Sequence, residues 1–278
     1  MMQITEQEFQ NLSEFIQSQF GIILNSEKKL LLTGRLHKLV DQLGFSSYTE
    51  YYHYLLNDGT GEANRVLSDK ISTNTTHFLR EPDHFDYFRD HVLPCLKYTK
   101  ETTGNRDFRI WCAASSTREE PYSLAMIMAD YFGIDSSKWD TRILATDISQ
   151  SVLDIAIKGI YPEERLRPLP QSWQLKYFKL YEKDDYEIVN TIKKDVAFQR
   201  INLMDKYFPF KKKFDVIFCR NVMIYFDQPT KYELMNRLCD YLEPGGYLFV
   251  GHSEALIKKI PGLEYIQQAL YRYLPLID

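Results

Sequence analysis

The chain has 278 residues, of which 44% are hydrophobic and 26% are charged, and its formal net charge is −4. This composition is that of an ordinary globular protein and excludes a disordered or fibrous chain. The length predicts one large α/β domain with a smaller partner domain. The negative charge argues against a nucleic-acid partner, because binding to a phosphate backbone requires a basic face.

No apolar run approaches the roughly 18 residues that a membrane-spanning helix needs, and the first residues carry no export signal. We therefore expect a cytoplasmic protein without direct membrane insertion. The four cysteines are far apart and form no Cys-x-x-Cys pair. They predict reduced core thiols, and we expect neither disulfides nor a metal site.

Residues 1–72 predict an all-helical N-terminal domain. Its first helix begins with a capping box at Thr5 and ends before Gly21, and its apolar residues recur at helical spacing. These apolar residues are Phe9, Leu12, Ile16 and Phe20. Three further helices are predicted over residues 26–43, 48–55 and 63–71.

The second predicted helix carries basic residues on the face opposite to its leucines. These residues are Lys28, Arg35 and Lys38. By charge pattern alone they indicate a solvated helix face, and a docking surface for an acidic partner is the alternative.

Residues 73–278 predict a Rossmann-like, doubly wound α/β domain, because strands and helices alternate. An amphipathic helix from Pro82 leads into this domain. Strands are predicted at 108–113, 142–146, 214–219 and 247–250, helices at 122–132, 152–157 and 231–242, and a turn at 244–246. Between them we expect an inserted antiparallel β-subdomain at about 160–200, with a hairpin formed by residues 186–189 and 196–198.

Two places in this pattern indicate a ligand site. In an open α/β sheet, ligands bind beyond the carboxyl ends of the strands, here the turn 114–120 and Asp147. The turn has no phosphate-binding glycine motif, whereas Glu119 and Glu120 could accept an ammonium group. All three acids have a simpler alternative role as helix N-terminal caps.

Four motifs resemble the bacterial chemotaxis receptor methyltransferases. They are STNTTHFLRE at 72–81, WCAASSTREEPYS at 111–123, FCRNVMIYFD at 218–227 and GHSE at 251–254. The resemblance runs through the whole chain in one order. It implies methyl transfer from S-adenosyl-L-methionine to glutamyl side chains on the cytoplasmic helices of chemoreceptors, leaving S-adenosyl-L-homocysteine.

The resemblance also implies roles for individual residues. Glu120 would hold the amino end of the cofactor, Asp147 its ribose, and Asn202 and Leu203 its adenine. Arg80 and Tyr225 would be catalytic. The residues expected to bind the cofactor are Asn74, Thr76, Arg80, Ala113, Glu120, Asp147, Ile148, Asn202, Leu203, Arg220 and Asn221. The basic face of the second helix would then dock onto the receptor.

The expected chemistry needs no catalytic base. A glutamate with a pKa of about 4.3 is already a nucleophile at neutral pH, so positioning supplies the catalysis. Arg80 could aim the acceptor carboxylate, or it could pair with Glu81 or Asp83. Tyr225 could reach the reacting groups or be a half-buried strand-end residue, and we expect His252 to be structural.

Two departures from the family pattern bear on function. Arg118 stands where the family usually has glycine, so it could block the cofactor, swing outward or pair with the cofactor carboxylate. It raises the alternative of a catalytically silent binding module. The loop 180–186 is short and lacks glycine, so we expect a protein that does not require a pentapeptide tether on the receptor. A methyltransferase for nucleic acid or a small molecule lacks support, because no Asn-Pro-Pro-Tyr or Asp-Pro-Pro-Tyr motif is present.

Overall fold

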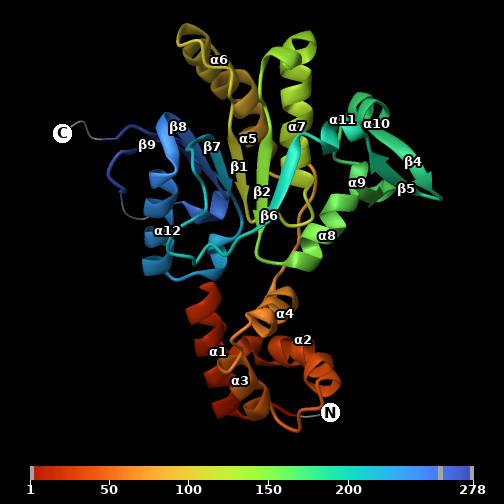
Figure 1. Cartoon of the computed structure of the whole chain (residues 1–278), viewed down its shortest axis with the longest axis vertical. Helices are drawn as coiled ribbons and strands as arrows, with labels where there is room; N and C mark the ends of the chain where they lie inside the picture. Colours follow the sequence, from red (N-terminus) through yellow and green to blue (C-terminus); the bar gives the residue numbers. More distant parts are fainter. Residues whose placement is uncertain (1–2, 256–258, 276–278) are drawn as a thin grey trace.

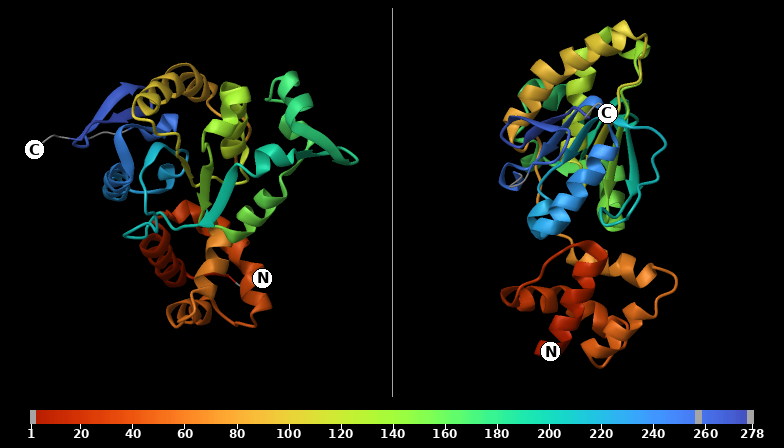
Figure 2. Two further views of the ribbon diagram at one scale, coloured as in Figure 1. Left: turned by 45° about the horizontal axis from the view of Figure 1, so that its top comes forward. Right: turned by 90° about the vertical axis from the view of Figure 1, so that its left-hand side faces the viewer.

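The computed structural model describes residues 3–255 and 259–275. A helical N-terminal domain stands at one end of a larger α/β domain, facing the edge toward which the central strands point (Figure 1, Figure 2). Within the described ranges, no helix is long and apolar enough to cross a lipid bilayer.

The helical domain packs its helices around one apolar core. Thr5 caps the first helix, because its side chain accepts a hydrogen bond from the backbone N–H of Glu8. The carboxylate of Glu8 in turn accepts from the backbone N–H of Thr5. Gly21 ends that helix at φ 72°, as expected. The helices of this domain are α1 (Glu6–Phe20), α2 (Lys29–Gln42), α3 (Tyr48–Leu56) and α4 (Glu62–Ile71), with a 3₁₀ turn at Ser26–Lys28 before α2.

The described part of the α/β domain contains a seven-stranded sheet in the order β6-β2-β1-β7-β8-β10-β9. Its first five strands in this order run parallel, and β10 is antiparallel to both of its neighbours. The strands are β1 (Ile110–Ala113), β2 (Ile143–Asp147), β6 (Val196–Arg200), β7 (Phe214–Cys219), β8 (Leu242–Val250), β9 (Leu263–Gln267) and β10 (Leu270–Tyr273).

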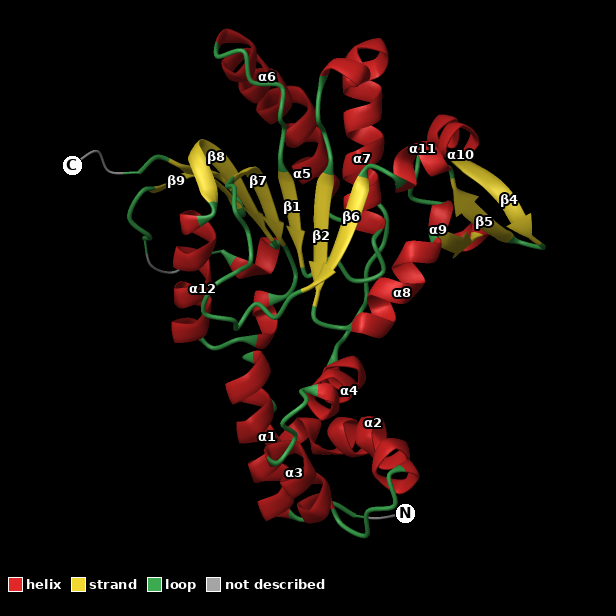
Figure 3. Cartoon of the chain, viewed as in Figure 1, coloured by secondary structure: helices red, strands yellow, loops and turns green. Residues whose placement is uncertain are grey.

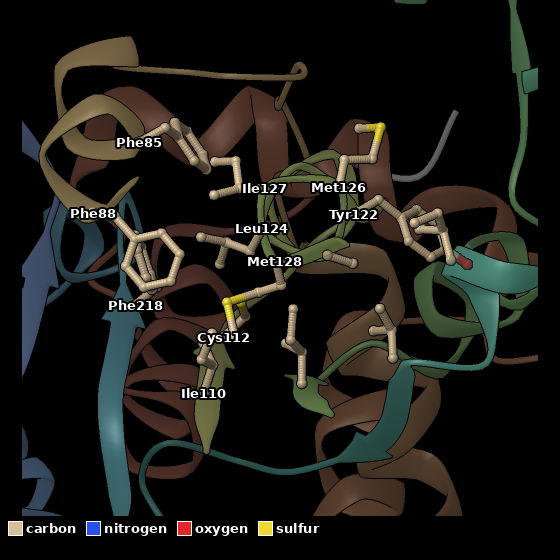
Figure 4. Close-up of a cluster of buried hydrophobic side chains, with 14 of the residues drawn as sticks. Phe85, Phe88, Ile110, Cys112, Tyr122, Leu124, Met126, Ile127, Met128 and Phe218 are labelled. Atoms are coloured by element: carbon tan, nitrogen blue, oxygen red, sulfur yellow. The ribbon is translucent and has the colours of Figure 1, made fainter. Parts of the chain in front are cut away.

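Apolar cores cover both faces of this sheet. Ile110 and Cys112 of β1 contribute to a core shared with α5, α6 and α7, part of which is drawn in Figure 4. Trp111 and Ala113 contribute to a second core on the side of α12. The flanking helices are α5 (Pro82–Tyr87), a π-helical segment (Phe88–Val92), α6 (Leu93–Thr102), α7 (Glu119–Phe132), α8 (Gln150–Lys158) and α12 (Gln228–Asp240). The predicted Rossmann-like class with an all-helical N-terminal domain is confirmed.

The small antiparallel sheet projects from the side of the domain, where Figure 3 shows β4 and β5. Its strand order is β3-β5-β4. The predicted hairpin of residues 186–189 with 196–198 is wrong, because β5 pairs with β4 and β3, whereas β6 pairs in parallel with β2. The inserted sheet therefore ends before β6. Its elements are β3 (Ile160–Pro162), α9 (Glu163–Leu166), α10 (Gln171–Tyr177), β4 (Phe178–Glu182), β5 (Asp185–Ile188) and α11 (Asn190–Lys193).

The predicted turn at 244–246 is also wrong, since these residues lie inside the continuous strand β8. The pairing of β7 with β8 shifts register beside them. Gly246 allows the close approach, because a Cβ there would lie 2.8 Å from the carbonyl oxygen of Asp215. The glycines thus permit an irregularity within the strand rather than a reversal of the chain.

Candidate active site

A tightly folded turn follows β1 and contacts the carboxyl end of β2. Ala114, Ser116 and Arg118 all have positive φ, at 62°, 51° and 82°. This backbone brings the N–H of Ser116 to 2.8 Å from Oδ2 of Asp147 at the end of β2. The N–H of Ser149 donates to the other carboxylate oxygen at 3.0 Å. The turn and the second strand are therefore fixed to one another through Asp147.

A large pocket opens above this turn, with about 1010 Å³ of space not filled by atoms, part of it open to solvent. Both domains line it, because α1, α4 and the linker 72–76 meet the strand ends there. Among the sequence-predicted residues, those that line it are Asn74, Thr76, Arg80, Glu120, Asp147, Ile148, Asn202, Leu203, Arg220, Asn221 and Tyr225. Ala113 is buried at the end of β1, next to Ala114, which lines the pocket.

Two carboxylates reach the pocket from different elements, Asp147 from the end of β2 and the half-buried Glu120 from the first turn of α7. Asp147 is only 6% exposed, and burial raises its pKa. Burial also raises the pKa of Glu120, while the guanidinium of Arg220 opposes this rise. The neighbouring Glu119 does not line the pocket, and its carboxylate lies 3.3 Å from Nη1 of Arg165. Of the two adjacent acids, Glu120 is therefore the one placed to contact a ligand.

Arg220 connects the end of β7 to the rest of the site. Its Nη1 donates to Glu120 at 2.8 Å, and its Nη2 donates to Glu81 at 2.9 Å. The amide of Asn221 also donates to Glu81, at 3.1 Å. Because these bonds are charge-assisted and largely buried, they fix the orientation of Arg220 and Glu120.

The sequence predicted no role in the site for Glu254, and for Glu81 only a possible pairing with Arg80. Both are half-buried or buried, and Glu254 accepts the backbone N–H of Asn221 at 2.7 Å and that of Ile224 at 3.0 Å. Both acids belong to motifs that carry the family resemblance. Their position inside these motifs was the signal that could have identified them as residues of the site.

Arg80 and Tyr225 lie at the pocket wall in different ways. Nη1 of Arg80 donates to the carbonyl oxygen of Thr75 at 2.9 Å. The alternative pairing of Arg80 with Glu81 or Asp83 is not seen, because Glu81 accepts from Arg220 and Asp83 lies 3.0 Å from His252. The carbonyl of Tyr225 accepts the N–H of Ile23 at 2.9 Å, which joins this wall to the segment after α1.

Arg118 turns away from the pocket and is completely buried. Its guanidinium lies 3.2 Å from the ring centroid of Phe198, and Nη2 donates to the carbonyl of Leu153 at 2.6 Å. Nη1 donates to the hydroxyl of Tyr122 at 3.2 Å. Burial lowers the pKa of Arg118 to about 10. The side chain thus fills the space between α7, α8 and β6, and it neither blocks the pocket nor reaches solvent.

The basic residues of the predicted second helix, which lie in α2 and in the 3₁₀ turn before it, are partly used within the chain. Arg35 donates to the carbonyl of Ile71, and its Nη2 donates to Oγ1 of Thr73 at 2.9 Å. Nζ of Lys28 lies 5.9 Å from the ring centroid of Tyr225. Lys38 is exposed. Two of the three basic residues therefore contact segments that line the pocket or adjoin it.

The chain is similar to known proteins over most of its length. The family described as "CheR methyltransferase, SAM binding domain" matches residues 74–270, and "CheR methyltransferase, all-alpha domain" matches residues 7–69. A chemotaxis protein methyltransferase of Borreliella burgdorferi is 44% identical over 270 residues, which cover 97% of this chain and 95% of that protein. One of Escherichia coli (strain K12) is 35% identical over 256 residues, covering 90% of this chain and 85% of that protein.

Proposed function

Since the chain belongs to the CheR methyltransferase family, with its S-adenosylmethionine-binding domain, we propose that it methylates glutamyl side-chain carboxylates of chemoreceptors to glutamate 5-O-methyl esters. The observation that carries the proposal is the pocket in which the half-buried Glu120 and the buried Asp147 face the same space as Arg80 and Tyr225. The activity belongs to chemotactic adaptation, and we place it in the cytoplasm.

The residues of the pocket fit S-adenosylmethionine. Glu120, which lines the pocket, would bind the ammonium of the amino-acid end, and Asp147 at the end of β2 would bind the ribose hydroxyls. The hydroxyls of Ser115 and Ser116 are buried without a hydrogen-bond partner among the described residues. Buried hydroxyls of this kind are normally satisfied, so they support a polar ligand at the turn. Asn202 and Leu203 would border the adenine.

The bound cofactor supplies a methyl group on a positively charged sulfur. The chain's own residues must then bring a glutamate carboxylate into line with that methyl group and exclude water. Arg80, which lines the pocket, would orient the acceptor carboxylate, and its hold must stay moderate, because tight ground-state pairing would weaken the nucleophile. Tyr225 would complete the wall at this point. Such positioning can supply several kcal/mol of the barrier reduction.

The acceptor would be presented by the helical domain, which we place at residues 1–72, ahead of the methyltransferase domain at 73–278. Lys38 supplies an exposed cation on α2, which also carries Arg35, and Lys28 lies in the 3₁₀ turn just before α2. Acidic receptor helices fit this basic face by charge. The interaction would place receptor glutamates near the linker 72–76, which lines the pocket.

We further propose that no pentapeptide tether is needed. The connection between β4 and β5 consists only of Lys183 and Asp184, and Lys183 adopts φ 46° without being glycine. This tight hairpin supports the view that no longer, glycine-containing gripping loop is present there. A titration with such a peptide that gives saturable, tight binding would overturn this part of the proposal.

The decisive experiment is the transfer of labelled methyl groups from S-adenosylmethionine to a receptor cytoplasmic fragment. Glutamate methyl esters release the label as methanol in base, whereas methylated amines keep it. We expect base-labile label with the native chain and very little with Asp147→Asn. Binding of S-adenosylhomocysteine without any transfer would instead support the catalytically silent module.

A further inference from the structure

A cluster of potential metal ligands lies beside the pocket but outside its lining. Ligand atoms of Glu81, His84 and His252 all lie within 4.8 Å of one another. Oδ2 of Asp83 lies 3.0 Å from Nε2 of His252. None of these four residues lines the pocket described above. Two distant parts of the chain therefore meet here, the start of α5 and the 3₁₀ turn His252–Glu254 after β8.

The central residue of this cluster is His84, whose side chain is completely buried. Its ring meets the rings of Phe249 and His252 edge-on, with centroid distances of 5.5 Å and 4.7 Å. Neither ring nitrogen has a hydrogen-bond partner among the described residues, although Nδ1 lies only 3.5 Å from Oε2 of Glu81. A buried polar atom without a partner costs about 1–3 kcal/mol, so two on one ring indicate that something else binds there.

Glu81 is held in a suitable orientation for a ligand. It has φ 57°, which is strained for a residue other than glycine, and its carboxylate accepts from Arg220 and Asn221. Carboxylates that ligate metals are commonly oriented by hydrogen bonds from neighbouring groups, and such bonds leave lone pairs free for an ion. The pairing with Arg220 is therefore compatible with metal binding by the same carboxylate.

We propose that Glu81, His84 and His252 bind one divalent cation of the zinc class, with Asp83 in reach as a fourth ligand. Two imidazoles with carboxylates favour Zn²⁺ over Mg²⁺ or Ca²⁺, which prefer oxygen ligands. Tetrahedral zinc with bonds of about 2.1 Å separates its ligands by about 3.4 Å. Glu81 Oε2 lies 3.5 Å from His84 Nδ1 and 4.0 Å from His252 Nε2, so only small side-chain movements are needed.

The site has an entry path and a structural consequence. The side chains of His252 and Asp83 are 35% and 50% exposed, so an ion can enter from that side. Once bound, it would fix Glu81 between itself and Arg220. The ion would thus stabilise the contact between the start of α5 and the end of β8, next to the residues that hold Glu120.

The test is calorimetric titration of zinc chloride into the full-length, tag-free chain after treatment with a chelator. We expect one zinc per chain, a higher melting temperature with zinc, and visible d–d absorption when Co²⁺ replaces zinc. His252→Gln and His84→Asn should each weaken zinc binding at least about tenfold. His53→Gln, which removes an exposed histidine in α3, is the matched control and should bind like the native chain.

His252→Gln alone decides the question if His84→Asn does not fold, because His252 is partly exposed. The proposal is overturned if the native chain shows no saturable zinc binding. It is equally overturned if His252→Gln binds zinc as tightly as the native chain, since the ion would then sit elsewhere on the surface.

Discussion

The burial of Arg118 predicts how the substitution Arg118→Gly changes cofactor affinity and stability. If its side chain obstructed the cofactor, glycine would raise the affinity for S-adenosylhomocysteine. The guanidinium instead packs on Phe198 and donates to Leu153 and Tyr122, away from the pocket. We therefore expect the affinity to change less than about threefold, while the chain becomes less stable.

The size of the stability loss follows from the contacts of Arg118. Hydrogen bonds from a charged donor contribute about 1.5–3 kcal/mol, and the contact with the ring of Phe198 adds about 0.5–2 kcal/mol. Glycine relieves the positive φ of 82°, which is worth about 1–2 kcal/mol, but it adds about 0.5–1 kcal/mol of backbone entropy. These ranges leave a net loss of about 0.5–5 kcal/mol, with a central value of about 3 kcal/mol.

Two assays separate these effects. Calorimetry with S-adenosylhomocysteine measures the affinity, and urea unfolding measures the free energy of unfolding. Arg118→Met is the matched variant, because it keeps the buried stem and the backbone strain but removes the polar contacts. An affinity gain of tenfold or more in Arg118→Gly would refute the reasoning, and so would a free energy of unfolding equal to that of the native chain.

Three further predictions address the pocket, the docking face and the core. Glu120→Gln should weaken S-adenosylhomocysteine binding about 10- to 100-fold, as expected for a lost charge-assisted bond. Burial raises the pKa of Glu120, so the native affinity should fall as the pH drops through that raised value, and calorimetry of the variant should show a weaker pH dependence. Lys38→Glu should reduce receptor methylation at unchanged S-adenosylhomocysteine affinity. The control Lys213→Glu, at an exposed residue before β7, should leave receptor methylation unchanged. Equal methylation by the two variants would mean that the basic face of α2 is only solvated and does not dock. Lys100 Nζ lies 2.8 Å from the buried carboxylate of Asp215. Lys100→Met should lower the free energy of unfolding, measured in urea, by about 3–5 kcal/mol, because Asp215 then stays buried without its cation. A loss below about 1 kcal/mol would contradict this prediction.

Local signals predicted much of the fold. The capping box at Thr5 and the helix end at Gly21 depend on interactions a few residues apart, so the sequence shows them directly. Asp147 and Glu120 were predictable for a different reason, because parallel strands bring their carboxyl ends to one edge of the sheet. Their common position at one edge of the sheet follows from the strand topology.

Strand pairing was harder to predict, because short strands do not encode their partners. Residues 186–189 and 196–198 both have strand-like sequences, and proximity in the chain favoured pairing them. The structure instead adds β6 to the main sheet beside β2, where Ile143 pairs with Val196. The network of Glu81, Arg220 and Glu254 was missed for the same reason, since it joins residues that are far apart in the chain.

Hydrogen bonds join the helical domain to the methyltransferase domain beside the pocket. Ser149 Oγ donates to Asp69 at 2.7 Å, and the amide of Asn202 donates to the carbonyl of Gln19 at 2.8 Å. Residues of α1 and α4 thereby become part of the wall that faces the cofactor. Arg35 extends this connection, because it holds Ile71 and Thr73 from the face of α2 on which we expect the receptor to dock. We propose that an acidic partner on that face competes for its guanidinium, which would couple docking to the position of the linker at the pocket wall.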